Sequence, residues 1–410
     1  MSGGEPDASG TPATAQDWSA PEREVRATAR ACLDSGEPAV LATVIAVDGR
    51  AYRRPGAKMV VAPGGGEVGG AAGDEPAADA EADRDPGPAT GAGSVTAGCL
   101  ADSVVELASE ALADGEPRVE RFDLRDDDAW GLGVGCDGVV DVLFEPLGER
   151  HRPLVASADE LDGGRTVAVA VESGDDRVAV GDRWIAEGSE TGGSDGDTTA
   201  RSLPPEVAAG VPDDVDGTDS VRVETEGGAV RLFVERVRPA PRLVVVGSNA
   251  DVRPVVASAR AAGFRVAVVG FRGGRATDER FPRADRVVAT SPRDLREAVD
   301  FGADDSVVLM THNFVDDRVA LGELLATPVD YVGVMGPTER FDRLRAALGD
   351  DGVDVDGDRE RIYAPVGLDL GGSSPAQVAH SIVAEVLAVR NDRSGGHLRE
   401  NDGPIHARDG

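Results

Sequence analysis

Two cysteines in the first half of the chain have neighbours that favour reactive thiols. Cys99 follows Gly98 and directly precedes a segment with helical spacing, residues 101–113. A thiol at a helix N-terminus meets the positive end of the helix dipole, which lowers its pKa and favours the thiolate. Cys136 lies in a glycine-rich turn before an apolar run that starts at Val139, so its thiol is expected to be accessible. The simpler interpretation, a small core residue, stays open for both cysteines.

The cysteines also limit the kind of metal site and the compartment. The chain has three of them, the third being Cys32, and shows no targeting segment. This odd count predicts reduced thiols in the cytoplasm rather than a disulfide framework. No C-x-x-C pair or nearby histidine is present to complete the four ligands of a zinc site. A zinc site is therefore not expected.

A small basic cluster stands out in the same half. Arg53, Arg54 and Lys58 lie between two apolar runs, and Lys58 is the only lysine of the chain. These three residues are named here the basic loop, and a solvent-exposed loop between two strands is the simplest interpretation of them.

In the second half, polar residues follow short apolar runs. Gly247 follows the run 243–246, and His312 and Asn313 follow the run 306–310. Because the carboxyl ends of parallel strands form the binding crevice of such sheets, these residues are candidates for a ligand site, as is Gly333 at the next strand. The alternatives are a histidine that caps a helix or bonds loop backbone, and a glycine that serves a strand-to-helix turn.

The same segment argues against an ordinary dinucleotide site. Only Gly247 remains of a G-x-G-x-x-G pattern, and Asn249 and Asp251 stand where backbone would approach phosphate. The second strand ends at Gly270 rather than at the acidic residue that holds a ribose hydroxyl. NAD(P) is therefore not favoured as a working cofactor.

Two domains must position these residues. Strands alternate with helices from Arg242 onward, which predicts an α/β fold with a Rossmann-like, doubly wound parallel sheet over 239–392. Its last helix is expected to begin after Ser374, with Pro375 at its first position and Gln377 completing a capping box. A separate α+β domain is expected over 21–150, with an acidic insertion at 67–92 and ordered pattern resuming at Ser94. The remaining predicted parts are a disordered tail at 1–20, a connecting region at 151–238 with single strands over 178–185 and 221–237 around an acidic loop at 187–219, and a tail at 393–410.

Charge narrows the function further. The chain of 410 residues carries 75 acidic and 42 basic residues, a formal charge of −33. Such a charge would repel a phosphate backbone, so nucleic-acid binding is not expected. No apolar run reaches the roughly 18 residues of a membrane span, so no membrane partner is expected either. A single lysine, 4% aromatic residues and many acidic ones are typical of a protein kept soluble in high salt.

Taken in order, these motifs resemble the XdhC/CoxI family, the xanthine dehydrogenase accessory proteins. The N-terminal resemblance rests on the runs 40–44, 49–59, 98–100, 135–138 and 143–147. The C-terminal resemblance rests on the segments 279–285, 311–313, 331–333 and 367–371, and on Pro375, Ala379, 381–382 and 384–386.

The resemblance implies an accessory role. Family members are associated with binding molybdenum cofactor as cargo, assisting its sulfuration and delivering it to molybdenum hydroxylases of the xanthine or carbon monoxide dehydrogenase type. It implies a molybdenum hydroxylase as partner and leaves a cysteine desulfurase and a homodimer open. No catalytic residue is assigned. The resemblance implies Cys99 and Cys136 as candidate soft ligands of a metal that stays unknown, and the basic loop as a candidate contact of the pterin phosphate. The expected cofactor-binding residues are Arg53, Arg54, Lys58, Gly98, Cys99, Cys136, Gly247, His312, Asn313, Gly333 and Asp369.

Two other functions stay open. The first is a nucleotide-dependent oxidoreductase that uses the Rossmann-like crevice and His312. The second is a scaffold without ligand, which only the eroded glycine motif supports.

Overall fold

The chain folds into two compact units, residues 1–239 and 240–410. The structure, a computed structural model, describes residues 17–62, 90–96, 100–125, 138–156, 164–187 and 203–400. The boundary lies where the sequence predicts the Rossmann-like domain to begin. The expected connecting region, however, is part of the first unit, because its strands pack on those of the N-terminal domain.

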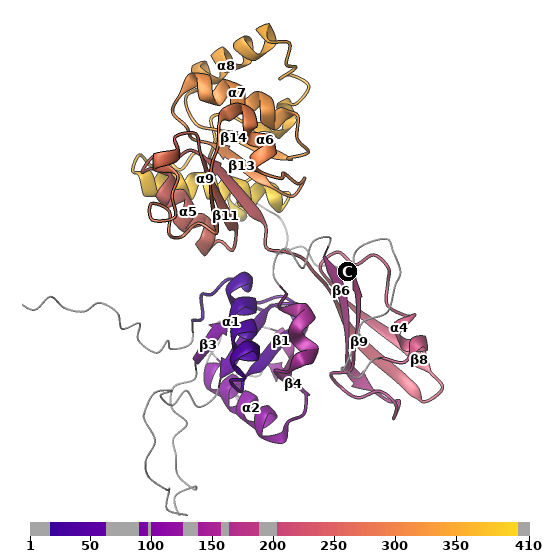
Figure 1. Ribbon diagram of the computed structural model, residues 1–410. Helices are drawn as coiled ribbons and strands as arrows, with labels where there is room; N and C mark the ends of the chain where they lie inside the picture. Colours follow the sequence, from indigo (N-terminus) through magenta and orange to yellow (C-terminus); the bar gives the residue numbers. More distant parts are fainter. Residues whose placement is uncertain are drawn as a thin grey trace, which may run out of the picture. The chain divides into compact units, whose positions relative to one another are not determined.

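The first unit contains two antiparallel sheets (Figure 1). The first sheet has the order β3-β2-β1-β5-β4, with β1 Val40–Gly49, β2 Lys58–Ala62, β3 Thr90–Gly93, β4 Arg118–Asp123 and β5 Gly138–Pro146. The second has the order β7-β6-β9-β8, with β6 Arg165–Ser173, β7 Arg183–Glu187, β8 Thr218–Thr225 and β9 Gly228–Val237. The helical segments are α1 Glu22–Ser35, α2 Ala101–Asp114, η1 Glu149–Leu154 and α4 Pro205–Ala208.

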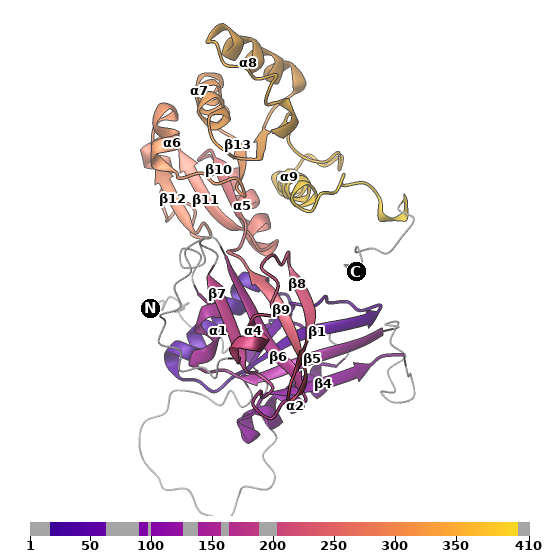
Figure 2. The same ribbon diagram turned by 90° about the vertical axis from the view of Figure 1, so that its right-hand side faces the viewer.

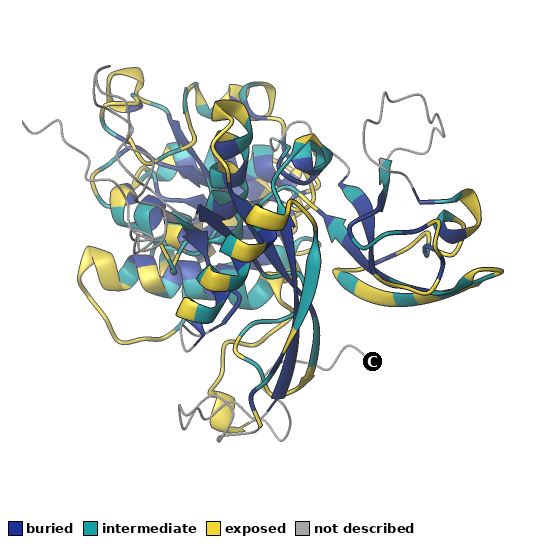
Figure 3. Cartoon of the chain, turned by 90° about the horizontal axis from the view of Figure 1, so that it is seen from below, coloured by how far each residue is buried: buried dark blue, intermediate teal, exposed yellow. Residues whose placement is uncertain are grey.

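Alternation along β1 explains how the first sheet is covered on both faces. Val40, Ala42 and Val44 point to the face on which α2 packs through Val104 and Ala108. Leu41 packs on the opposite face with α1, and Ile45 meets Val169 and Phe233 of the second sheet. Both faces of the strands β1, β2 and β5 are thus largely buried. Buried residues, dark blue in Figure 3, lie mainly on strands across the molecule.

Several predictions for the first unit need correction. Residues 218–237 form a hairpin of β8 and β9, not one strand, and 174–182 are turns before β7. The expected acidic loop at 187–219 contains α4, and its apolar residues pack on the second sheet, namely Leu203, Val207, Val211 and Val215. Regular structure resumes at β3, before Ser94, and Trp18 of the expected tail packs against the core. Most of the predicted insertion at 67–92 lies outside the described residues.

The second unit confirms the predicted fold class. Six parallel strands have the order β12-β11-β10-β13-β14-β15. They are β10 Arg242–Val246, β11 Arg265–Gly270, β12 Arg286–Ala289, β13 Ser306–Leu309, β14 Tyr331–Val334 and β15 Ile362–Tyr363. The inner strands are apolar on both sides, because helices cover both faces of such a sheet.

Two groups of helices sandwich this sheet. On one face lie α5 Val252–Ala261 and α9 Pro375–Arg390, packed through Val255, Ala259 and Ile382. The other face carries α6 Leu295–Ala298, α7 Phe314–Leu325 and α8 Thr338–Asp350 (Figure 2). Single turns are η2 Gly273–Arg275, η3 Pro292–Asp294, η4 Arg359–Arg361 and η5 Leu398–Glu400. The last of these lies in the expected tail 393–410.

The predicted start of α9 is confirmed. The Ser374 hydroxyl accepts a hydrogen bond from the Gln377 amide, and the Gln377 side-chain oxygen accepts one from the Ser374 amide. Such a reciprocal cap satisfies two backbone donors that a helix start leaves unpaired.

Candidate functional site

A pocket opens at the carboxyl edge of the parallel sheet. β10 has β11 on one side and β13 on the other, so the connections run in opposite directions on either side of β10. Crevices at such a switch point are the usual ligand sites of doubly wound sheets. The pocket has a volume of about 260 Å³ and is named here the switch-point pocket. Its lining comprises Gly247, Ser248, Asn249, Phe271, Arg272, Arg275, Thr311, His312, Asn313 and Asp316. The predicted residues Gly247, His312 and Asn313 are thus brought together.

Gly247 is explained by strand packing. A Cβ atom at this position would lie 2.5 Å from the carbonyl oxygen of Met310, at the end of the neighbouring strand β13. No real Cβ atom tolerates such a contact with backbone, so any larger residue would push β10 and β13 apart. The glycine is needed for the fold whether or not a ligand binds.

The start of α5 carries a negative charge. Asp251 is the residue before the first turn, and its carboxylate Oδ2 lies 2.6 Å from Nε2 of His312. In dinucleotide folds this helix start receives the pyrophosphate. Here an aspartate and its histidine partner stand at that place, so the aspartate opposes a bound phosphate.

His312 and Asn313 have different local roles. His312 has φ = 58°, in the left-handed region that residues other than Gly adopt uncommonly and in which Asn, Asp and His are enriched. This backbone turns its imidazole toward Asp251. Asn313 caps α7, since its Oδ1 accepts hydrogen bonds from the amides of Val315 (2.9 Å) and Asp316 (3.1 Å). The predicted helix cap exists, but the asparagine makes it rather than the histidine.

The left-handed backbone at His312 gives a stability prediction. We expect His312→Gly to be about 1 kcal/mol more stable than His312→Ala, because glycine adopts φ = 58° without strain and alanine does not. Both variants lose the imidazole, so the contact with Asp251 cancels in the comparison. Urea unfolding followed by far-ultraviolet circular dichroism measures the difference. An alanine variant as stable as the glycine variant would contradict the prediction.

Two arginines that line the pocket were not predicted from the sequence. Arg272 and Arg275 follow β11, where a dinucleotide fold would have its acidic residue, and both are exposed. Arg272 Nη2 donates to Asp316 Oδ2 at 2.8 Å, and Arg275 Nη1 donates to Asn249 Oδ1 at 3.2 Å. The sequence feature that could have identified them is their position just beyond the end of the second strand, since no motif marks them.

Gly333 and Asp369 are not among the residues that line this pocket. A Cβ atom on Gly333, within β14, would lie 2.5 Å from Val366 Cγ2, so the glycine lets the segment after β15 cross the strand. That segment is held by Glu385 of α9, whose Oε2 accepts from Tyr331 Oη (2.6 Å) and the Gly367 amide (2.9 Å). Burial, aided by the Glu385 carboxylate, raises the pKa of Tyr331. Asp369 follows in the same segment and is exposed.

The basic loop is not uniformly exposed. Lys58 is 6% exposed, and its Nζ lies 2.5 Å from Glu235 Oε2 of β9 and 3.0 Å from the carbonyl of Gly56. Burial alone would lower the pKa of Lys58, but the carboxylates of Glu235 and Glu22 together outweigh it and raise that pKa. A phosphate would therefore have to displace Glu235, so Lys58 is not the surface cation that the sequence suggested. Arg53 and Arg54 are half-buried, and the Nε atom of each is buried without a hydrogen-bond partner among the described residues.

The predicted ligands Gly98, Cys99 and Cys136 lie outside the described residues. Their neighbours Thr96, Leu100 and Gly138 are buried, and Gly138 pairs with Gly49 at the end of β1. The end of β3, the start of β5 and the basic loop all adjoin one edge of the first sheet, because strand pairing is antiparallel throughout. The third cysteine, Cys32, is buried in α1, and burial raises its pKa. Within the described ranges no group of three or more His, Cys, Asp or Glu could hold a metal ion.

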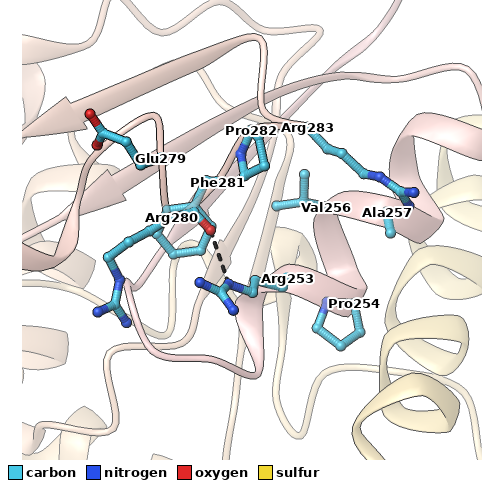
Figure 4. A pocket seen from close by; sticks show the side chains of 9 residues that line it. All are labelled: Arg253, Pro254, Val256, Ala257, Glu279, Arg280, Phe281, Pro282 and Arg283. Atoms are coloured by element: carbon cyan, nitrogen blue, oxygen red, sulfur yellow. Dashed lines mark hydrogen bonds between the residues drawn. The ribbon is translucent and has the colours of Figure 1, made fainter. Parts of the chain in front are cut away.

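A second, larger pocket lies beside α5. It has a volume of about 460 Å³ and is bounded by residues 253–257 of the helix and by the segment 279–283 (Figure 4). The Arg253 side chain donates through Nε to the carbonyl of Arg280 at 2.9 Å, which ties the segment to the helix. This contact positions part of the stretch 279–285 that carries the family resemblance.

No helix in the described part of the chain is long and apolar enough to cross a bilayer.

Fold and pocket define a class of protein: an antiparallel α+β unit joined to a Rossmann-like unit with a pocket at its switch point. Residues 243–386 match the family described as "XdhC Rossmann domain", and residues 32–84 match the "XdhC and CoxI family". Both parts are matched in the same order, which confirms the resemblance of this chain to the XdhC and CoxI family that the sequence motifs show.

Individual relatives agree with this assignment. The chain is 26% identical over 364 residues to a protein of Bacillus subtilis named as a probable xanthine dehydrogenase subunit, covering 88% of this chain and 96% of that protein. It is 31% identical over 189 residues to "Uncharacterized protein YqeB" of Escherichia coli, covering 46% of this chain and 34% of that protein. A crystal structure described as a xanthine dehydrogenase from Bacillus halodurans is 25% identical, covers 92% of this chain and 98% of its own, and superposes with a TM-score of 0.65.

Proposed function

We propose that this protein is an accessory factor that binds molybdenum cofactor, assists its sulfuration and hands it to a molybdenum hydroxylase of the xanthine or carbon monoxide dehydrogenase type. A relative matched over 96% of its length bears the name of a xanthine dehydrogenase subunit, which supports a xanthine dehydrogenase-type enzyme as the partner. The odd number of thiols supports action in the reducing cytoplasm.

The observation that carries the proposal is the pair of side chains at the start of α5. Asp251 and His312 stand at the place where a dinucleotide-dependent oxidoreductase holds pyrophosphate. A Rossmann-like unit that keeps its switch-point pocket but opposes pyrophosphate suits another ligand better than NAD(P). The cargo would meet soft ligands in Cys99 and Cys136 and basic groups in Arg53 and Arg54.

Cofactor retention and delivery test this function. We expect protein purified from its native host, at that host's salt concentration, to carry a pterin and molybdenum, measured by pterin fluorescence after oxidation and by elemental analysis. Cys99→Ala with Cys136→Ala should reduce the activity of the hydroxylase in cells by about tenfold or more, since soft ligands are lost. Cys32→Ala, which removes the buried thiol of α1, is the matched control.

The opposite result is equally clear. Protein that neither retains nor takes up pterin or molybdenum, together with a double cysteine variant that leaves the hydroxylase fully active, would refute the proposal. Capture of a cysteine desulfurase by the tagged protein tests the sulfuration step, and light scattering tests a homodimer.

The pocket itself keeps one alternative, a nucleotide-dependent oxidoreductase. Titration with NADPH and NADH distinguishes it, because tight binding that Asn313→Ala abolishes would favour the enzyme. Asn313→Ser is the matched control for Asn313→Ala, since serine also caps a helix and should keep α7 intact.

A further inference from the structure

We propose that the switch-point pocket binds a phosphate monoester, with the phosphate held by Arg272 and Arg275 rather than by the start of α5. Where the monoester is a pterin phosphate, this inference rests on the proposed function. The site itself lies within the second unit and includes no residue of the basic loop.

The start of α5, the usual phosphate position in dinucleotide folds, is unsuited to phosphate in this protein. Asp251 places its carboxylate at the start of α5 and is bonded to His312 at 2.6 Å. The dianion of a phosphate monoester would meet a like charge there, which disfavours binding. The glycine that lets backbone approach phosphate in dinucleotide folds is also missing, because Asn249 stands at its position. A phosphate in this pocket therefore needs different donors.

Such donors line the same pocket after β11, on Arg272 and Arg275. Two guanidinium groups carry ten N–H donors, and the hydrogen bonds described for Arg272 and Arg275 use three of them, to Phe271, Asp316 and Asn249. Both side chains are exposed at the pocket lining. Planar guanidinium forks match the geometry of phosphate oxygens and form charge-assisted hydrogen bonds with them.

The local charge has the right sign. The lining residues include two arginines and a single carboxylate, Asp316, in a chain whose formal charge is −33. Asp316 already pairs with Arg272, and this contact holds the guanidinium at the pocket while leaving its other edge available. The two guanidinium groups supply the positive charge of this lining, and a small anion is drawn to them.

Volume sets the size of the ligand. About 260 Å³ is below the usual range of roughly 300–1,000 Å³ for pockets that enclose a whole drug-sized ligand. The pocket therefore suits the phosphate end of a ligand and its nearest atoms better than an entire dinucleotide. Two sources of this chemistry are considered: a pterin that carries a terminal phosphate monoester, and a nucleotide that carries an extra 2′-phosphate.

Paired ligands that differ by one phosphate test the site in the full-length protein. The pterin pair is the air-oxidised, fluorescent derivative of the cofactor with and without its phosphate, and the nucleotide pair is NADP⁺ and NAD⁺. Affinities are measured by fluorescence and calorimetry at one fixed ionic strength. We expect the phosphorylated pterin to bind at least about tenfold more tightly than the dephosphorylated form, as two charge-assisted contacts predict.

Variants identify the residues that hold the phosphate. Arg272→Gln with Arg275→Gln should reduce this preference to below about threefold, because glutamine keeps polarity but loses the charge. Arg318→Gln is the matched control, since it removes an arginine of α7 that pairs with Asp351 and does not line the pocket. Circular dichroism before each titration checks that the variants are folded.

The outcomes separate this inference from the proposed function. Pterin binding without a preference for the phosphate, or a preference that survives in the double variant, would overturn the inference and leave the accessory role intact. A preference for NADP⁺ over NAD⁺ that the double variant abolishes, with no pterin bound, would support the phosphate site and refute the pterin as its ligand.

Discussion

Replacing Glu145 with glutamine is expected to lower the free energy of unfolding of the first unit by about 3–5 kcal/mol. Glu145 of β5 is 2% exposed, and its Oε1 lies 2.6 Å from Nη2 of Arg183 on β7, which is 3% exposed. Glutamine has nearly the same shape but no charge, so it leaves the guanidinium buried without its counter-ion. Removing one partner of a buried pair costs far more than the intact pair contributes.

Tryptophan fluorescence can measure this loss selectively. The three tryptophans of the chain, Trp18, Trp130 and Trp184, all belong to the first unit. Urea unfolding followed by their emission therefore reports on that unit alone. Glu172→Gln is the matched control, since it breaks a pair with Arg231 in which the carboxylate is 59% exposed, and should cost less than about 1 kcal/mol. Equal stability of Glu145→Gln and the wild type would show that the pair is not needed.

The same pair predicts a dependence on pH. Burial alone would raise the pKa of Glu145, but the charge of Arg183, with His151 and Arg150, lowers it from 4.5 to about 2. Because the folded-state pKa is the lower one, the stabilisation is complete above about pH 5 and is lost as the pH falls from about 4.5 to 2. The loss amounts to about 3 kcal/mol. The stability difference between wild type and Glu145→Gln should shrink over this range, and a constant difference would contradict the assignment.

Lys58→Met is expected to cost about 3–5 kcal/mol in the same unit, by leaving Glu235 of β9 buried without its cation. The double variant Lys58→Met with Glu235→Leu should regain most of this stability, because a buried ion pair can be replaced by apolar side chains of similar size. Tryptophan fluorescence during urea unfolding measures both changes.

This pair of variants also tests the phosphate role predicted for Lys58. If the ammonium only joins the two sheets, the double variant should be folded and bind the phosphorylated pterin derivative like the wild type. A folded double variant with at least about tenfold weaker binding would instead assign Lys58 to the ligand. Failure of the double variant to regain stability would show that the surroundings of Lys58 need the charge for another reason.

The parallel sheet and the start of α9 were predictable because their signals are local. Inner strands of such a sheet are buried on both sides, so 243–246 and 306–310 appear as short apolar runs between helical segments. The capping box of α9 is contained in four consecutive residues, from Ser374 to Gln377. Neither prediction depends on knowing which distant segments meet.

The errors have local and distant causes. The β8–β9 hairpin turns at Glu226 and Gly227, a turn signal that the continuous valine pattern outweighed. In 203–217 the loop prediction followed the acidic residues and missed four apolar residues that recur every four positions and are buried in the structure. The partner of Lys58 lies 177 positions away, so no local pattern could show that its charge is already used. Arg272 and Arg275 become a site only when the sheet places β11 beside β10.

The burial of Lys58 has a practical consequence for chemical labelling. As the only lysine, it is the one ε-amino group that amine-directed reagents can modify, and in the folded unit it is 6% exposed and paired with Glu235. Its acylation requires the two sheets of the first unit to separate. The rate at which the peptide containing Lys58 gains mass in the presence of such a reagent would therefore record how often this unit opens, with no label introduced by mutation.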